Sequence, residues 1–112
     1  LLVVGGAGSL LLPGGTRVID SEGFPAEYKA EASAGAVFLD DLRREQQLDW
    51  TFVSPSAEFV EGERTGAFRI GKDDLLVSSA GRSWITFADY AIALIDEVEA
   101  PKHVRQRFTV GY

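Results

Sequence analysis

Apolar positions along the chain fall into short continuous runs and one long segment with helical spacing. Residues 1–4 (LLVV) form an apolar run that ends in a glycine-rich turn, which is typical of a parallel strand buried on both faces. From Ala26 to Gln47, apolar residues recur every three or four positions between charges, and Pro25 stands where a helix often begins. The pattern predicts a strand followed by an amphipathic helix.

The second half of the chain repeats this order. Residues 49–54 (DWTFVS) are aromatic and β-branched, which predicts a strand. Thr86, with Asp89 three positions later, predicts a capping box that opens a second helix, and Pro101 marks the end of that helix. Residues 106–110 (QRFTV) predict a closing strand.

The connecting segments carry weaker signals. Residues 17–19 are expected to form a short extended piece. The stretch 56–82 is irregular, with two weak extended pieces at 67–70 and 75–78. Because the polar turn 71–74 (GKDD) joins these two pieces, the pattern indicates a β-hairpin.

The order of the predicted elements is strand, helix, strand, hairpin, helix, strand. Strands that alternate with helices of this length imply right-handed crossovers and a mainly parallel sheet, so we expect an α/β fold. The chain starts directly with an apolar strand at Leu1 and contains no methionine. We therefore expect residues 1–112 to be one partial domain, the later part of a longer polypeptide.

Composition narrows the classes of function. The chain is 46% hydrophobic and 25% charged, which is typical of a globular protein. Its net charge of −6 argues against a nucleic-acid partner, and the dispersed basic residues, Arg43 and Arg107 among them, are expected on solvated faces. The absence of cysteine excludes disulfides and thiolate chemistry. No apolar run approaches the roughly 20 residues of a membrane span, so we expect a cytoplasmic protein without a membrane partner.

The glycine turn is not a dinucleotide fingerprint. Gly6 and Gly8 follow the first strand, but Leu11 stands where a third glycine is needed, and residues 13–15 (PGG) leave no room for a helix. Two interpretations remain open. The turn lies where parallel sheets bind ligands, and Ser9 offers a hydroxyl there; the alternative, favoured by the local sequence alone, is a tight turn with a capping serine.

The layout of several motifs together is more specific. The segments VVGGAGSL, FPAEYKAEA, LDWTFVSPSAEF, RTGAFRIG and ITFADYAIALIDE…RFTV resemble the later half of an atypical short-chain dehydrogenase/reductase. The similarity is strongest to the NADH-flavin reductase group, which is related to NAD(P)-dependent epimerases and dehydratases, and more distant to biliverdin reductase B. The resemblance implies the C-terminal half of a Rossmann-like domain, whose glycine motif would precede residue 1.

By this resemblance, residues 1–4 correspond to the fifth strand of the family, whose end faces the nicotinamide and the substrate. The implied cofactor is NADP or NAD, with FMN or FAD as a possible substrate. Ser9 is the candidate catalytic residue, with Gly8 as the register alternative. The implied cofactor-binding residues are Gly6, Ala7, Gly8, Ser54, Pro55 and Ser56, and the implied substrate-binding residues are Ser9, Tyr28 and Phe59.

One departure from the family pattern affects the expected chemistry. Standard members use Tyr-x-x-x-Lys for proton transfer, but Ala32 follows Tyr28 four positions on, and Lys29 has the wrong helical phase. We therefore expect no Tyr–Lys relay. The resemblance then implies hydride transfer to a flavin-like or quinone-like acceptor, with the chain by itself inactive. The alternative is a non-catalytic NAD(P)-sensing or interaction protein on the same fold.

The remaining polar residues add no site. His103 is the single histidine and is expected in a surface loop, and the adjacent acids at 40–41 and 73–74 do not suggest a metal. Trp50 and Trp84 are expected to anchor the core. The strand 1–4 would have an unprotected edge, so we expect poor solubility or self-association through it.

Overall fold

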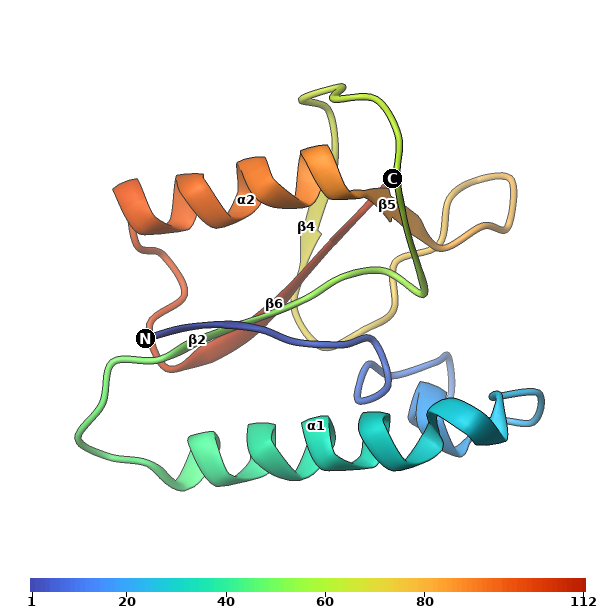
Figure 1. The fold of residues 1–112 in the computed structure, drawn as a ribbon, viewed down its shortest axis with the longest axis horizontal. Coiled ribbons are helices and arrows are strands. Elements are labelled where there is room, and N and C mark those ends of the chain that lie inside the picture. Colours follow the sequence, from blue (N-terminus) through green and yellow to red (C-terminus); the bar gives the residue numbers. More distant parts are fainter.

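The computed structural model describes residues 1–112 as a four-stranded sheet with one helix on each face (Figure 1). The helices are α1 (Ala26–Arg44) and α2 (Phe87–Glu99). The sheet contains, in spatial order, β1 (Leu2–Val4), β2 (Thr51–Ser54), β6 (Gln106–Gly111) and β4 (Arg69–Gly71). A separate pair is formed by β3 (Glu58–Val60) and β5 (Trp84–Thr86), and residues 18–20 form the 3-10 helix η1.

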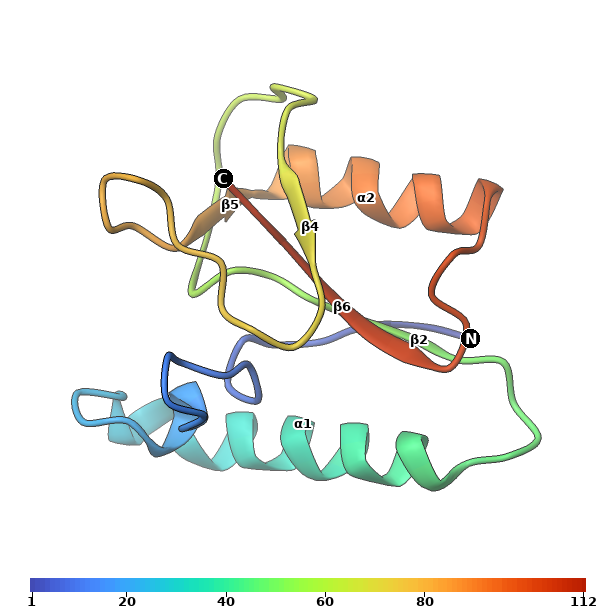
Figure 2. The ribbon, with the colours of Figure 1, turned by 180° about the vertical axis from the view of Figure 1, so that it is seen from behind.

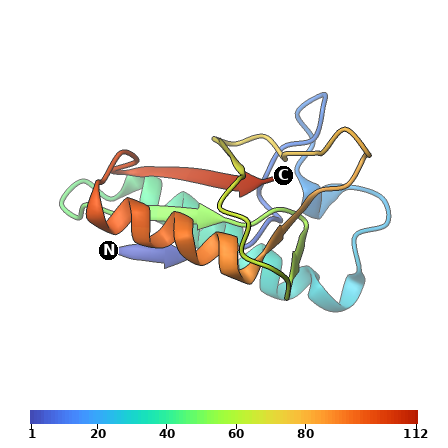
Figure 3. The same ribbon diagram turned by 90° about the horizontal axis from the view of Figure 1, so that it is seen from above.

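The three strands β1, β2 and β6 are parallel, and only β4 runs antiparallel, against β6. Figure 3 shows the parallel strands side by side with β1 at the outer edge, and Figure 2 shows β4 beside β6. Because α1 connects β1 to β2 on one face and α2 precedes β6 on the other, both faces of the sheet are covered. The expected fold class, α/β with a mainly parallel sheet and crossover helices, is confirmed.

The core has two parts, one on each face of the sheet. On the α1 face, Trp50 and Phe52 pack against the helix residues Leu39 and Leu42. On the α2 face, six buried residues form the second cluster: Val53, Ile85, Tyr90, Ala93, Phe108 and Val110. The alternation of β2 side chains between the two faces follows from the two-residue period of a strand.

Several predicted local structures are wrong. Residues 75–78 form no strand, so there is no hairpin with 67–70; instead, Ile70 pairs with Val110 of β6. Of residues 17–19, Arg17 is extended and forms an isolated antiparallel bridge with Leu11, whereas Val18 and Ile19 belong to the 3-10 helix instead of an extended piece. The edge of β6 offers hydrogen-bonding backbone groups to β4, although the two strands are distant in sequence. The pairing of β4 with β6 takes the place of the predicted pairing between residues 67–70 and 75–78. The pair β3–β5 was not predicted.

The first strand was predicted to be buried on both faces, and it is not. Val4 is 61% exposed, because β1 lies at the edge of the sheet and pairs with β2 alone. The first helix ends at Arg44, three residues earlier than predicted, where Glu45 adopts an extended conformation. No helix of the structure has the length and apolar character that crossing a membrane would require.

The predicted cap of α2 is present, but its acid has a second role. The Thr86 hydroxyl accepts the N–H of Asp89 at 3.1 Å. The fully buried Asp89 carboxylate accepts the N–H groups of Thr65 and Gly66, each at 2.9 Å, and the hydroxyls of Thr65 and Tyr112. Burial raises the pKa of Asp89, but these hydrogen bonds outweigh it and lower the pKa to about 2. The carboxylate thus holds the loop after β3 against the start of α2.

His103 lies in a loop, as expected, but it is not a surface residue. Its side chain is 17% exposed, stacks on Phe108 with a centroid distance of 4.2 Å, and contacts Glu97 through Nδ1 at 2.8 Å. Glu97 also accepts the backbone N–H groups of Lys102 and His103. Burial raises the pKa of Glu97, yet the hydrogen bonds from His103 and Lys102 lower it overall. This cluster fixes the turn from α2 into β6.

We predict that Gly5→Ala destabilises the fold by about 1–3 kcal/mol, because overpacking a filled core forces side chains to move. A Cβ atom at position 5 would lie 2.1 Å from the ring of the buried Phe52. Gly6→Ala is the matched control, since nothing lies within 4 Å of its Cβ position. Urea unfolding measures both variants, and equal effects would contradict the packing argument.

We also predict that Asp89 makes stability fall in acid. Its pKa in the folded chain is about 2 against an ordinary 3.8, so its contribution is present above 3.8 and is lost as the pH falls toward 2. Asp89→Asn should therefore be less stable at neutral pH and show a shallower loss of unfolding free energy in this range. Asp96→Asn, an exposed acid on the same helix, is the control. An unchanged slope in Asp89→Asn would refute the prediction.

Candidate functional site

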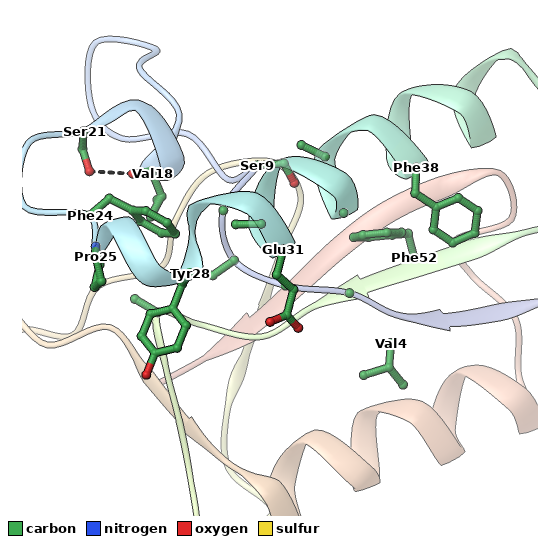
Figure 4. A pocket seen from close by; sticks show the side chains of 18 of the residues that line it. Val4, Ser9, Val18, Ser21, Phe24, Pro25, Tyr28, Glu31, Phe38 and Phe52 are labelled. Atoms are coloured by element: carbon green, nitrogen blue, oxygen red, sulfur yellow. Dashed lines mark hydrogen bonds between the residues drawn. The ribbon is translucent and has the colours of Figure 1, made fainter.

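A cavity of about 790 Å³ lies between the glycine-rich loop after β1 and helix α1 (Figure 4). Its walls come from the carboxyl end of β1, the loop that carries η1, and one face of α1. Most of the lining is apolar side chains or glycine, and the polar exceptions include Ser9, Ser21, Glu22 and Glu31. This is the edge of a parallel sheet at which α/β proteins bind ligands.

The glycines of the loop allow close approach of the backbone to its neighbours. The N–H of Gly5 donates to Val53 of β2 at 2.9 Å, and the site of a Gly5 Cβ is filled by Phe52. A Cβ at Gly8 would lie 3.1 Å from Ala32 of α1. Gly6 is exposed, with open space at its Cβ position, so a flat ring could approach the backbone there.

Ser9 is held at the inner end of this loop by Arg107. The Arg107 guanidinium donates to Ser9 Oγ at 2.8 Å through one terminal nitrogen, and to the Ser9 carbonyl oxygen at 3.2 Å through the other. The first nitrogen also donates to Ser54 Oγ at 3.2 Å, and Nε donates to Asp73 at 3.0 Å. Arg107 therefore joins the loop after β1, the end of β2 and the loop after β4.

Arg107 was expected on a solvated face, and that expectation is wrong. Its side chain is 1% exposed, because β6 is an inner strand and residue 107 points to the face that α1 covers. Burial lowers the pKa of the guanidinium, while the hydrogen bond and the charge of Asp73 oppose that shift. The signal that was overlooked is the position of this charge within the otherwise uncharged strand segment RFTV.

A second cavity of about 400 Å³ lies on the other side of Ser9. Five charged side chains line it: Arg17, Asp40, Arg43, Asp73 and Arg107. One carboxylate oxygen of Asp73 accepts from both Arg43, at 2.9 Å, and Arg107. Arg43 thus has a partner, while its side chain remains partly exposed as expected. Ser9 contributes to the lining of both cavities.

Helix α1 brings Tyr28 to the first cavity, where its side chain is 57% exposed (Figure 4). Ala32, one turn later, packs against Gly8. Position 32 therefore holds a small packing residue and not the lysine of a Tyr-x-x-x-Lys motif. Lys29 is exposed and lies outside the lining of the cavity.

Of the residues implied by the resemblance, the structure brings five to this cavity and leaves four outside it. Gly6, Ala7, Gly8, Ser9 and Tyr28 line the cavity, whereas Ser54, Pro55, Ser56 and Phe59 do not. The serines at the end of β2 are buried: Ser56 Oγ donates to Val110, and Ser54 binds Arg107 and Thr109. Phe59 instead packs edge-to-face against Phe87 and at a tilt against Tyr90. Roles for these residues in binding stay predictions.

Further lining residues were not anticipated. Phe24, Phe38 and Phe52 contribute to the apolar surface (Figure 4). Gly35 also lines the cavity, and nothing lies within 4 Å of its Cβ position. The spacing of Tyr28, Ala32 and Gly35 is that of one helix face, which is the signal available in the sequence. No group of three or more acidic or histidine side chains is arranged to hold a metal ion.

No family model matches the sequence. The uncharacterised protein YwnB of Bacillus subtilis is 49% identical over 113 residues, covering 98% of this chain and 53% of YwnB. Among solved structures, a candidate epimerase from Bacteroides thetaiotaomicron superposes with a TM-score of 0.95 at 47% identity, covering 99% of this chain and 52% of that one. A candidate NADH-flavin reductase from Streptococcus pneumoniae gives 0.91 at 43% identity, with 98% and 54% covered.

These likenesses show that the chain has a Rossmann-like fold, shared with a candidate epimerase and a candidate NADH-flavin reductase. The chain spans about half the length of the proteins it matches. A candidate exported protein from Burkholderia pseudomallei is also similar, with a TM-score of 0.91 and 48% identity over 99% of this chain and 54% of that one. Localisation in the cytoplasm therefore stays a prediction.

Proposed function

We propose that this chain forms the nicotinamide side of an NAD(P)H-dependent oxidoreductase of the short-chain dehydrogenase/reductase type, which transfers hydride to a flavin-like or quinone-like acceptor. The observation that carries the proposal is the cavity at the carboxyl end of β1. Glycine backbone forms one side of it and the anchored Ser9 lies at its inner end. The resemblance to an NADH-flavin reductase from Streptococcus pneumoniae supports the same chemistry.

The residues present fit one end of the dinucleotide. Gly6 and Ala7 allow a flat ring to lie against the backbone, and Phe24 and Tyr28 provide an apolar wall that limits access of water. The loop lacks a third glycine and a following helix, so it offers no pyrophosphate cradle. When bound, the reduced nicotinamide supplies the hydride. In this proposal the chain orients the two rings, and the Ser9 hydroxyl binds a carbonyl oxygen.

A second function is favoured by one specific observation. Because Ala32 packs on Gly8 where a standard relay has lysine, the site has no lysine at that position to assist proton transfer. A protein that senses NAD(P) without turnover would need the cavity but not the relay. Oxidation of NADPH by the full-length protein, with FMN as acceptor, distinguishes the two functions, since a sensor binds NADPH without consuming it.

An NADPH titration tests whether the cavity is the binding site, with energy transfer from Trp50 and Trp84 to the nicotinamide as the signal. We expect saturable binding by the native chain. Gly35→Leu adds a side chain to the open helix face that lines the cavity, and should weaken binding about tenfold or more by occupying ligand space.

The matched control is Ala34→Leu, which adds a similar volume to the exposed side of the same helix. It should bind like the native chain. Absence of binding by a native chain whose circular dichroism shows it to be folded would overturn the proposed function for these 112 residues. Equal binding by Gly35→Leu and the native chain would place the ligand elsewhere.

The exposed edge of β1 supports a proposal about self-association. This strand pairs with β2 on one side only, and the side chains of Leu1 and Val4 are largely exposed. Unpaired backbone groups beside apolar side chains favour pairing with a second copy. We expect concentration-dependent dimers in sedimentation experiments, reduced by Val4→Lys. A native chain that stays monomeric would contradict this.

A further inference from the structure

The contacts of Ser9 with Arg107 restrict what the serine hydroxyl can do. A guanidinium has five N–H donors and no acceptor, so Ser9 Oγ must accept in its 2.8 Å contact with Arg107. The hydroxyl proton is then not used in this contact, and Ser9 Oγ donates no hydrogen bond within the protein. Ser9 is therefore prepared as a donor toward a group in the adjoining cavities.

Arg107 fixes the serine at two points. One terminal nitrogen binds the side-chain oxygen and the other binds the carbonyl oxygen of the same residue. Contact at both points limits rotation of the serine backbone and of its χ1 angle together. A lysine ammonium is a single point charge and cannot reproduce this planar two-point grip.

The guanidinium is itself held from the opposite side. Its Nε donates to Asp73, and the same carboxylate oxygen accepts from Arg43 of α1. The side chain of Arg107 is buried beneath these groups, so its orientation is set by the loop after β4 and by α1. Charge-assisted hydrogen bonds of this kind are stronger than neutral ones.

We propose that Arg107 is the positioning residue of this site: it holds the Ser9 hydroxyl as a hydrogen-bond donor to a carbonyl oxygen of the hydride acceptor, a flavin or a quinone. The identity of the ligand in this inference rests on the proposed function. The placement of Ser9 by Arg107 is independent of that function and can be measured without a ligand.

The ligand-free experiment is amide hydrogen exchange of the native chain and of Arg107→Met. We expect exchange in residues 6–19 to become at least about tenfold faster in the variant, while α2 keeps its protection, because the arginine contacts hold the loop locally. Arg105→Met is the control, since Arg105 is exposed and lies outside both cavities. Unchanged exchange in residues 6–19 would overturn the proposal, and so would a uniform increase that includes α2.

The ligand experiment measures FMN affinity by fluorescence in a double-mutant cycle of Ser9→Ala and Arg107→Met. We expect each single variant to weaken FMN binding about tenfold, which is the upper end of the usual range for one neutral hydrogen bond, and the double variant to be no worse. Additive losses, or native affinity in Arg107→Met, would show that the arginine does not act through Ser9.

Two further variants keep the test decisive if Arg107→Met does not fold. Arg107→Lys retains the charge but not the two-point grip, and Asp73→Asn retains the shape of the anchor without its charge. Both should show faster exchange in residues 6–19, with smaller changes than Arg107→Met. If the native chain binds neither NADPH nor FMN, the proposed function fails while the exchange data still decide the role of Arg107.

Discussion

The buried guanidinium of Arg107 is the interaction on which the site depends. It lies on the inner strand β6, yet its contacts reach three other segments: the glycine loop at Ser9, the end of β2 at Ser54, and the loop after β4 at Asp73. A charge placed in a sheet interior is costly unless its donors are satisfied, so these segments must meet in one arrangement. Because the hydrogen-bond donors of Arg107 must have acceptors, Ser9 is held in one position, and this fixes the inner end of the cavity.

Close packing of backbone fixes the other side of the cavity. Gly5 has no room for a side chain beside Phe52, and Gly8 lies against Ala32 of α1. The strand β1 can therefore turn sharply into its loop while the loop remains in contact with the helix. The residue in this contact, Ala32, stands four positions after Tyr28, where a Tyr-x-x-x-Lys relay has its lysine. The loop and the helix face therefore meet closely at Gly8 and Ala32.

The sheet and its two helices hold the segments of this chain together. The parallel strands β1, β2 and β6 are each joined through a helix, and each face of the sheet has its own apolar cluster. The Asp89 carboxylate then ties the loop after β3 to the start of α2, and Glu97 ties the end of α2 to the turn into β6. Buried acids thus hold both ends of the helix that covers the α2 face.

The sequence by itself determined the order of the main elements, the α/β class, the cap of α2 at Thr86 and the glycine loop with Ser9, because periodicity, capping and turn chemistry are local. It did not determine the pairing of β4 with β6 or the burial of Ser54 and Ser56. It also did not reveal that Arg107 is buried against Ser9, 98 residues away. These features depend on which strand lies inside the sheet and which lies at its edge, and only the tertiary structure decides that.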